Sequence, residues 1–474
     1  MTTDTPAVEA TAVEEELGVR LEEKRTERLR GAVHGEVIEP GDPGYDEARR
    51  VYNAMHDRRP AVIVRAADVG DVIAAVGLAR EEDLPLAVRG GSHAVAGYGT
   101  CDGGVVLDLG RMRGIRVDPA ARTARAEGGC TWADFNHAAH AFGLATTGGV
   151  VSSTGVGGLT TGGGMGYLAR RYGLACDNLV AADVVTADGS FTTCSAEQEP
   201  DLLWAVRGGG GNFGVLTSLE FRLHPVGEIL GGPTFYPLDP DVLRHYRELI
   251  ADADEDFNAL LVVALGPPVP FLPERWHGRP LCGLVTCWTG PSDQDARIRG
   301  RLAELGPVIG QFLERIPYPV INTLFDELLP AGLFHYWKGA FSLGLPDEAI
   351  DVYTEYGART PSIESATVVF PIDGAVHRVG PEESAFAYRD VAFSTALSPT
   401  LRTRAECEAH IPWVRDFEAA LAPYSAAGAY VNFMDGDDQG RVRNNYRQNF
   451  DRLRDLKRRY DPGNLFRLNH NIAP

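Results

Sequence analysis

The amino-acid sequence predicts an α+β fold with two domains, of which the second has a mainly antiparallel sheet covered by helices. Its 474 residues, 44% of them hydrophobic, are enough for two domains of ordinary size with buried cores. Glycine is concentrated between residues 90 and 214, and its density falls beyond about residue 226. From about 227 to 424 the chain is richer in proline, aromatic residues and alternating segments such as PLCGLVTCWTG, which is typical of antiparallel strands.

The first elements of the chain follow from residue patterns. Residues 1 to about 25 are polar and aperiodic, which predicts a flexible leader. The β-branched run Ala61–Val64 predicts a strand, and Asp68 suits the N-cap of a helix that carries apolar residues at helical spacing over Val69–Val76. An extended pattern resumes at Leu86–Val88, so the order is strand, helix, strand and then glycines.

A second helix is expected to begin at Thr131 and to stop at Gly143. Its apolar face is predicted to hold four side chains: Trp132, Phe135, Ala139 and Phe142. Downstream, the extended runs at 184–187 and 190–193 flank Asp188-Gly189, the strongest short signal for a β-hairpin.

The domain boundary is placed near Pro225, where the glycine-rich part ends. The last fifty residues are expected to be helical again, until Asp461-Pro462-Gly463 breaks the pattern. The helical spacing there is carried by aromatic and apolar residues: Tyr446, Phe450, Leu453 and Tyr460.

Charge and composition exclude several classes of protein. The formal net charge of -20 and pI near 5.1 leave no basic patch for a nucleic-acid backbone. No run of about 18 apolar residues occurs, and the N-terminus is acidic without an apolar stretch, so we expect a cytoplasmic protein rather than a secreted or membrane-embedded one. The seven cysteines are scattered without a C-x-x-C pair, which indicates reduced thiols.

Glycine comes in three bursts, RGGSH at 89–93, GVGGLTTGGGMG at 155–166 and RGGGGNFG at 207–214. Because glycine lets backbone amides approach a ligand closely, the bursts predict a long backbone-lined groove of the kind that holds a dinucleotide pyrophosphate. None is a G-x-G-x-x-G that opens a helix after the first strand, which disfavours an NAD Rossmann domain. Any single glycine could equally serve a tight turn.

The motifs RGGSHAVAG, LDLGRM, GVGGLTTGGGMGYLARRYGL and DLLWAVRGGGGNFGV follow in order, and the chain closes on LKRRYDPGNLFRLNHNIAP. This set closely resembles the berberine-bridge-enzyme-like flavin oxidases, which belong to the vanillyl-alcohol-oxidase or PCMH type of FAD proteins. The resemblance implies a PCMH-type FAD-binding domain at 26–226, a substrate-binding domain at 227–424 and a C-terminal segment at 425–474 that completes the FAD domain.

The resemblance also implies how the cofactor is attached. The histidine of the family's R-G-G-x-H motif bonds to the flavin, and His93 matches it. A histidyl substituent raises the flavin potential and prevents loss of the cofactor. Many members add a second bond from a cysteine that would stand at Val151, so FAD is expected to be held by a single covalent link. Cys130 is interpreted as a buried thiol.

Further FAD contacts implied by the resemblance come from the glycine-rich segments and the tail. The backbone from Arg89 to His93 and Gly97 is expected to hold the pyrophosphate, although Arg89 could instead be a surface charge. The complete set is Arg89, Gly90, Gly91, Ser92, His93, Gly97, Gly157, Gly158, Gly162, Gly163, Asn212, Phe213, Gly214, Val215, Asn469 and Asn471. For the two tail asparagines, a turn-forming role is an equal alternative.

The family's Y-x-N-[YF] motif, here YVNF, makes Tyr430 the candidate catalytic base. A base must lie within hydrogen-bond reach of the proton that leaves as hydride departs from carbon, and a phenol serves only if cations or donors lower its pKa. The alternative is an aromatic side chain that shapes the pocket, as expected for Tyr336, Trp337 and Trp288.

Three patterns that suggest other sites are rejected. Asp435-Gly436-Asp437-Asp438 lacks the later ligands of a calcium loop and is interpreted as a solvated turn. His137 and His140 lack a third zinc ligand, and the glycine bursts lack the lysine and hydroxyl of a P-loop. No metal is expected.

The expected function is therefore an FAD-dependent oxidase that removes hydride from a C–H bond beside a hydroxyl or amine of a small organic molecule and reduces O2 to H2O2. An aromatic natural-product intermediate or a sugar is the expected substrate. The alternatives are a dehydrogenase or monooxygenase of the same fold, and a catalytically silent binding scaffold. No nucleic acid or membrane is expected as a partner, and the oligomeric state is left open.

Overall fold

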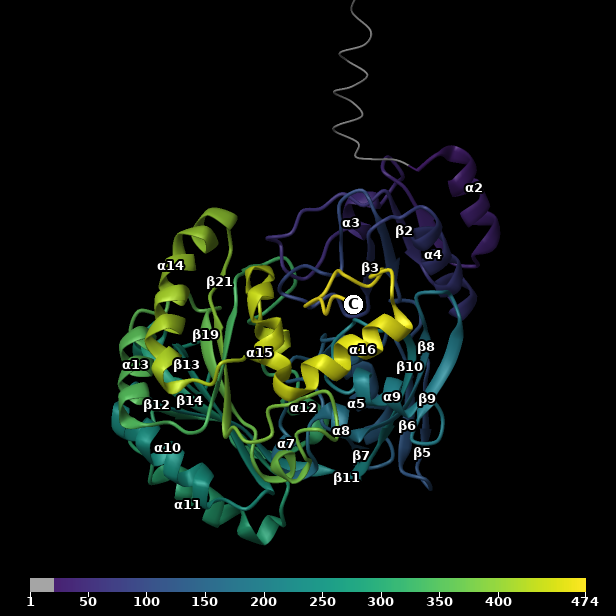
Figure 1. Cartoon of the computed structure of the whole chain (residues 1–474). Helices are drawn as coiled ribbons and strands as arrows, with labels where there is room; N and C mark the ends of the chain where they lie inside the picture. Colours follow the sequence, from purple (N-terminus) through teal and green to yellow (C-terminus); the bar gives the residue numbers. More distant parts are fainter. Residues whose placement is uncertain (1–20) are drawn as a thin grey trace, which may run out of the picture.

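The structure is a computed structural model that describes residues 21–474 (Figure 1). Most of the predicted leader, residues 1–20, lies outside the described residues. Its last part was predicted wrongly, because helix α2 (Glu23–Ala32) already begins at Glu23. Two side chains explain why this helix forms: Leu29 is buried in the core, and the buried Thr26 donates a 2.7 Å hydrogen bond to Glu39.

The first sheet has four strands in the order β1-β2-β4-β3, and β4 pairs in parallel with both of its neighbours. The predicted strands are confirmed as β2 and β3, and the predicted helix as α4 (Val69–Glu81). Asp68 caps that helix by accepting a hydrogen bond from the Asp71 amide. The strands are β1 (Glu36–Ile38), β2 (Val62–Arg65), β3 (Leu86–Arg89) and β4 (Val105–Asp108), with the short helix α3 (Tyr45–Ala48) after β1.

A second, fully antiparallel sheet follows in the order β5-β6-β10-β8-β9. Its strands are β5 (Ile115–Asp118), β6 (Thr123–Glu127), β8 (Leu179–Val185), β9 (Phe191–Ser195) and β10 (Val215–Arg222). The predicted hairpin is confirmed, since β8 pairs with β9 and Gly189 adopts φ +84° in the turn. Gly189 therefore occupies the left-handed region that a turn of this type requires.

Helix α5 (Trp132–His140) is capped by Thr131 and Asp134 in a reciprocal capping box. Trp132, Phe135 and Ala139 are buried against the second sheet as predicted. The prediction for Phe142 was wrong, because the helix ends at His140 and the Phe142 side chain is 52% exposed.

Five short elements connect these layers and carry the glycine-rich segments. They are the helices α6 (Val156–Thr161), α7 (Ala169–Tyr172), α8 (Ala175–Asn178) and α9 (Pro200–Val206), and the strand β7 (Leu144–Ala145), which pairs with β11 (His224–Pro225). The next strand, β12, already belongs to another sheet.

That sheet has eight antiparallel strands, seven of them in the order β15-β12-β14-β13-β19-β20-β18, with β16 paired to β12. The strands are β12 (Glu228–Pro237), β13 (Phe257–Leu265), β14 (Pro280–Trp288), β15 (Gly310–Gln311), β16 (Glu314–Pro317), β18 (Lys338–Ser342), β19 (Ala366–Pro371) and β20 (Phe393–Ser398). Side chains alternate between its faces, since Leu261 and Val263 of β13 pack in one core cluster and Leu260 and Val262 in another.

Four helices cover the outer face of this sheet (Figure 1): α10 (Pro240–Asp252), α11 (Asp295–Ala303), α13 (Asp347–Gly357) and α14 (Arg404–Leu421). The opposite face packs on residues of the glycine-rich domain, such as Met165 and Tyr167. The small helix α12 (Tyr318–Ile321) packs on this same face through Tyr318 and Ile321. The strands β17 (Phe334–His335) and β21 (Thr400–Leu401) form a separate two-stranded sheet. Both faces of the eight-stranded sheet are therefore buried, which explains the almost uninterrupted apolar character of β13 and β14.

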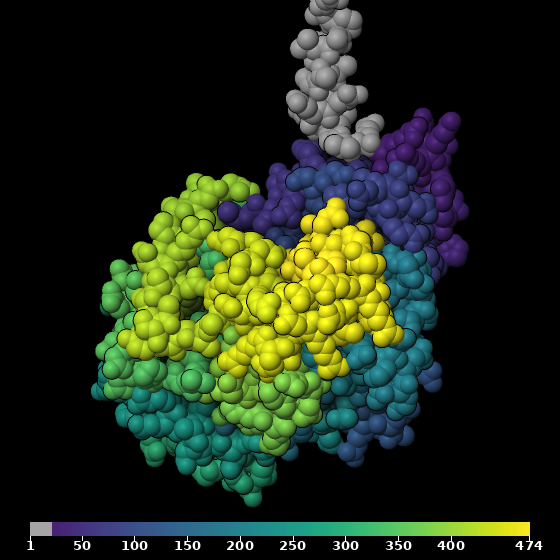
Figure 2. All heavy atoms as spheres, in the orientation of Figure 1, coloured from purple at the N-terminus to yellow at the C-terminus, as the bar shows by residue number. Residues whose placement is uncertain are grey.

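The C-terminal segment returns to the first domain. Helices α15 (Val442–Tyr446) and α16 (Phe450–Tyr460) confirm the predicted helical pattern, and their apolar residues join the core of the second sheet. Figure 2 shows this segment on the surface across the junction of the two domains. The ion pair of Lys457 and Asp461, both fully buried, holds the tail that follows.

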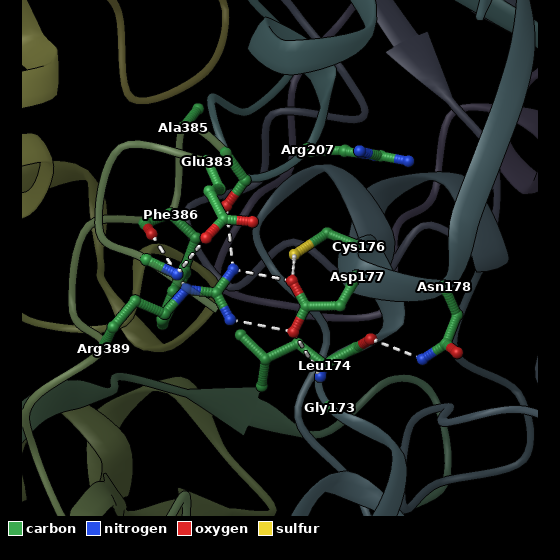
Figure 3. Close-up of polar contacts among 12 residues, drawn as sticks. Gly173, Leu174, Cys176, Asp177, Asn178, Arg207, Glu383, Ala385, Phe386 and Arg389 are labelled. Carbon is green, nitrogen blue, oxygen red and sulfur yellow. Dashed lines mark hydrogen bonds and ion pairs between the residues drawn. The ribbon is translucent and has the colours of Figure 1, made fainter. Parts of the chain in front are cut away.

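A second buried ion pair joins the domains away from the tail. The carboxylate of Asp177 in α8 accepts hydrogen bonds of 2.6 and 2.8 Å from the guanidinium of Arg389, and both side chains are less than 10% exposed. Figure 3 shows the two groups facing one another beside Cys176. All seven cysteines are free and buried, and burial raises the pKa of the Cys130 thiol to about 12. Across residues 21–474, no helix is long and apolar enough to cross a membrane.

Candidate functional site

A cavity of about 310 Å³ lies where the glycine-rich domain, the eight-stranded sheet and the C-terminal tail meet. One wall is the loop that follows β3, from Arg89 to Gly99. A second wall comes from segments between 149 and 165 together with Gly210 and Gly211. Residues 430–434 and the tail residues between 466 and 470 close the cavity. Segments distant in sequence therefore share one site.

The loop after β3 offers backbone donors to this cavity. The amides of Gly91 to Ala96 donate no hydrogen bond to any residue that the structure describes, and Ser92 adopts φ +64°, which is uncommon for a residue with a side chain. Successive free amides in such a turn form a concave site for an anion. A Cβ on Gly91 would lie 2.2 Å from the Gly155 amide nitrogen, so only glycine allows these two loops to touch.

Arg89 anchors the start of this loop through buried polar contacts. Its guanidinium contacts Asp108 at 2.6 Å and the carbonyls of Ala48 and Arg50 at 2.7 and 3.1 Å. With 5% of its surface exposed, Arg89 is a buried structural cation, and the alternative that it is a surface charge was wrong.

The imidazole of His93 projects at the cavity wall. Its Nε2 lies 2.8 Å from the hydroxyl of Ser153, and its ring stacks on Tyr52 with centroids 3.9 Å apart. Burial lowers the pKa of His93 to about 4, so the ring is neutral near pH 7 and keeps one nitrogen lone pair. Val151, which stands at the position of the family's second attachment residue, lines the same cavity.

Polar side chains around the cavity have unused hydrogen-bonding atoms. Five buried atoms of lining residues lack a hydrogen-bond partner within residues 21–474: Ser92 Oγ, Trp337 Nε1, Tyr446 Oη, Asn469 Oδ1 and His470 Nδ1. Buried polar atoms are normally satisfied, so this set indicates a ligand rich in donors and acceptors. Together with the free amides of the loop, the residues present fit a dinucleotide such as FAD.

The side of the cavity next to the eight-stranded sheet is aromatic and uncharged. It is formed by Trp337, Phe370, Tyr430 and Phe433 together with Leu329. The prediction that Trp337 shapes the pocket is confirmed. Tyr336 and Trp288 were placed there wrongly, because Tyr336 hydrogen-bonds Asp437 and Trp288 packs under the helices on the outer face.

Tyr430 contributes its hydroxyl to this aromatic wall. The oxygen accepts hydrogen bonds from the Gly164 amide at 2.9 Å and from Asn432 Nδ2 at 2.8 Å. These two donors favour the phenolate, but burial outweighs them and raises the pKa of Tyr430 to about 12. The lowered pKa that a phenol base requires is therefore not provided by the protein alone.

Several predicted contacts lie at the cavity, namely Arg89, Gly90, Gly91, Ser92, His93, Gly158, Gly162 and Asn469. Others do not line it: Gly97, Gly157, Gly163, Asn212, Phe213, Gly214, Val215 and Asn471. Two examples give the physical reason. A Cβ on Gly97 would lie 2.3 Å from the His56 ring, and Asn212 uses its amide to bind the Gly209 and His470 carbonyls and the Ile472 amide. These residues shape and fasten the segments that line the cavity.

Tyr52, Tyr98, Tyr446 and His470 are among the polar and aromatic residues of the site that sequence reasoning missed. Tyr98 and His470 stand beside predicted residues and could have been found by extending the motifs by a few positions. Tyr446 was recognised only as part of a helical pattern. Tyr52 carries no sequence signal, because its place beside His93 depends on the packing of the segment before β2.

The rejected metal patterns have other roles. Asp437 and Asp438 both pair with the buried Lys338, and Asp438 is only 5% exposed, so this turn is an ion-pair cluster rather than the solvated turn that was expected. His137 and His140 line a separate cavity of about 290 Å³ beside α12. Within residues 21–474, no group of three or more His, Cys, Asp or Glu side chains is arranged to hold a metal ion.

Comparisons with known proteins agree with this geometry. A model described as an FAD binding domain matches residues 60–195, and one described as berberine and berberine-like matches residues 429–473. An FAD-linked oxidoreductase of Dictyostelium discoideum is 30% identical over 450 residues, covering 94% of this chain and 95% of its own. The (R)-6-hydroxynicotine oxidase of Paenarthrobacter nicotinovorans is 30% identical over 455 residues, covering 94% and 97%.

Solved structures include two proteins with the same fold as this chain. The crystal structure of 6-hydroxy-D-nicotine oxidase from Arthrobacter nicotinovorans has a TM-score of 0.82 at 29% identity and covers 93% of this chain and 98% of its own. The Physcomitrella patens BBE-like 1 protein shares the fold, with a TM-score of 0.83 at 19% identity over 95% and 99% of the two chains.

Fold, cavity and relatives together define an FAD-linked oxidoreductase of the PCMH type. The cavity is closed by the same C-terminal segment that the berberine-like model matches. The chain belongs to the berberine-bridge-enzyme-like family of FAD oxidases.

Proposed function

We propose that this protein is an oxidase in which FAD is linked covalently through His93 alone, and that it oxidises a neutral aromatic compound at a C–H bond beside a hydroxyl or amine. The observation that carries the proposal is the neutral imidazole of His93, which meets the cofactor cavity with an uncommitted nitrogen. A neutral imidazole is the nucleophilic form that a bond to carbon requires. Valine at position 151 offers no second nucleophile.

FAD, when bound, takes the hydride equivalent and passes the electrons to O2, giving H2O2. The chain supplies binding and orientation. The free amides of Gly91 to Ala96 would hold the pyrophosphate, and the unpartnered atoms of Ser92, Tyr446 and Asn469 would bind other polar groups of the cofactor. The two domains and the tail would exclude water around it.

The substrate class follows from the aromatic wall. Trp337, Phe370 and Phe433 offer ring faces without a charged group beside them, which favours a planar uncharged substrate over a sugar. One relative is named as an oxidase of (R)-6-hydroxynicotine, a compound that contains an aromatic ring.

Tyr430 is our candidate for the group that receives the proton. It is the only ionisable side chain among the lining residues on the substrate-domain side and in 430–434. The hydrogen bonds from Gly164 and Asn432 would stabilise the phenolate form that accepts the proton. Since its pKa stands at about 12, kcat/KM should rise with pH toward the alkaline range. Tyr430→Phe should lower kcat by about 10²–10⁴-fold. If the variant has the same pH profile as the wild type, Tyr430 is not the base and only shapes the pocket.

The decisive experiment denatures the purified protein in acid and asks, by absorbance and intact mass, whether FAD stays attached. We expect retention in the wild type and release from His93→Ala. Release from the wild type would refute the covalent link. Peroxide formed per aromatic alcohol or amine consumed then separates an oxidase from a dehydrogenase or a monooxygenase, and a colourless protein would indicate a silent scaffold.

A further inference from the structure

We propose that Tyr52 and Ser153 clamp the imidazole of His93 for cofactor attachment, Tyr52 by stacking on the ring and Ser153 by binding Nε2, so that Nδ1 is left to meet the flavin. Both are positioning residues for cofactor attachment. The inference rests on the proposed covalent link through His93, but it makes a separate claim about which side chains hold the ring.

Tyr52 fixes the plane of the His93 ring. The two rings lie 20° from parallel with centroids 3.9 Å apart, and the ring of His335 also stacks on Tyr52, with centroids 5.0 Å apart. The Tyr52 hydroxyl donates a 2.9 Å hydrogen bond to the Leu329 carbonyl, so the phenol is held at its far end. The ring of His93 therefore rests on a side chain that has little freedom to move.

The backbone around Tyr52 is tied to the same loop. The Tyr52 amide donates to the Ser92 carbonyl at 3.2 Å. Its neighbour Asn53, which is fully buried, donates from Nδ2 to the carbonyls of Val95 and His335 at 2.7 and 3.0 Å. These contacts join the segment before β2 to the loop that carries His93, so the stacked geometry is part of the fold rather than a surface encounter.

Ser153 binds one of the two ring nitrogens of His93. Its hydroxyl lies 2.8 Å from Nε2, whereas Nδ1 has no hydrogen-bond partner in the described residues. If Nε2 carries the proton and donates it to Ser153, the lone pair is on Nδ1. Ser153 is exposed, so a proton passed to its hydroxyl can reach solvent.

Attachment of the flavin to His93 is an oxidation. O2, the oxidant of the proposed function, accepts the electrons. A bond forms between His93 Nδ1 and the methyl carbon of the flavin's dimethylbenzene ring. One hydrogen leaves that methyl group and one leaves the imidazole through Ser153. The two electrons and two protons reduce one O2 to H2O2.

The experiment measures attachment itself. Full-length protein made under riboflavin-limited growth is mixed with FAD, and the covalent fraction is followed by intact mass after acid quenching. Ser153→Ala should attach FAD about tenfold more slowly, as expected for the loss of one hydrogen bond worth about 1.4 kcal/mol. Ser153→Thr keeps a hydroxyl and should restore the rate. Ser152→Ala is the matched control, because the Ser152 hydroxyl binds Asp326 instead of His93.

A second pair of variants tests the stacking of Tyr52 on His93. Tyr52→Phe keeps the stacked ring and should attach FAD at nearly the wild-type rate, whereas Tyr52→Leu should slow attachment about tenfold. NMR of the isolated flavin peptide from wild type should place the bond on Nδ1. Noncovalent FAD binding and circular dichroism identify any variant that fails to fold, and the Ser153 pair then carries the test.

The outcomes separate the two proposals. A wild-type protein without covalent flavin refutes the proposed link through His93. A covalent wild type that bonds through Nε2, or that attaches FAD equally fast in Ser153→Ala, overturns the clamp while leaving the proposed function intact.

Discussion

The buried ion pair of Lys457 and Asp461 offers the sharpest test of how the tail is held. Lys457 Nζ contacts Asp461 at 2.6 Å and the carbonyls of Asn212 and Phe466 at 2.9 and 3.0 Å. Lys457→Met removes the cation and leaves a fully buried carboxylate without its partner, which costs about 3–5 kcal/mol in comparable pairs. We therefore expect the free energy of unfolding to fall by about that amount.

Loss of this ion pair should also weaken FAD binding. Asp461 accepts the amides of Leu465 and Phe466, and the tail that begins there supplies Phe466, Asn469 and His470 to the cavity wall. An unpaired Asp461 should loosen this turn, so Lys457→Met should bind FAD more weakly in addition to unfolding earlier. Unfolding in urea and FAD titration measure the two effects.

A double-mutant cycle isolates the pair itself. Asp461→Asn should also destabilise the protein, and the double variant should lose less than the sum of the single losses, with a coupling of about 1–3 kcal/mol. Arg458→Met is the matched control, because that neighbouring side chain is half exposed and pairs with an exposed Asp455. A loss below about 1 kcal/mol in Lys457→Met, or strict additivity, would refute the reasoning.

Three further predictions follow from other residues. Burial and neighbouring acids raise the pKa of Asp435 to about 6 from 3.8, so the folded state binds more protons between these values and loses stability as pH rises. Asp435→Asn should therefore raise the melting temperature well above pH 6 and change it little near 3.8. Val151→Cys in a His93→Ala background should restore covalent FAD, detected by intact mass, because both side chains meet the same cavity. Arg389→Met should lower the free energy of unfolding by about 3–5 kcal/mol in urea, because it leaves Asp177 buried and unpaired, and Arg389→Lys should lose less.

Local patterns that depend on neighbours in sequence were predicted well. Asp68 and Thr131 cap helices because a side chain oxygen three residues from an amide can bind it, and Asp188-Gly189 turns because glycine accepts a positive φ. Phe142 was misplaced because periodicity does not give the residue at which a helix ends. Periodicity also does not give the residue at which a helix begins, so the predicted leader extended past Glu23, the first residue of α2.

The sequence by itself determined the fold class, the presence of an FAD-type cavity and the place of His93, since the glycine-rich motifs are contiguous and read from the chain alone. The tertiary structure decided which glycines line the cavity and which only fasten it, as Gly97 shows. It also decided the partners of His93, because Tyr52 and Ser153 come from separate segments brought together by packing. Contacts between distant segments depend on how whole elements pack, and no local pattern in the chain encodes them.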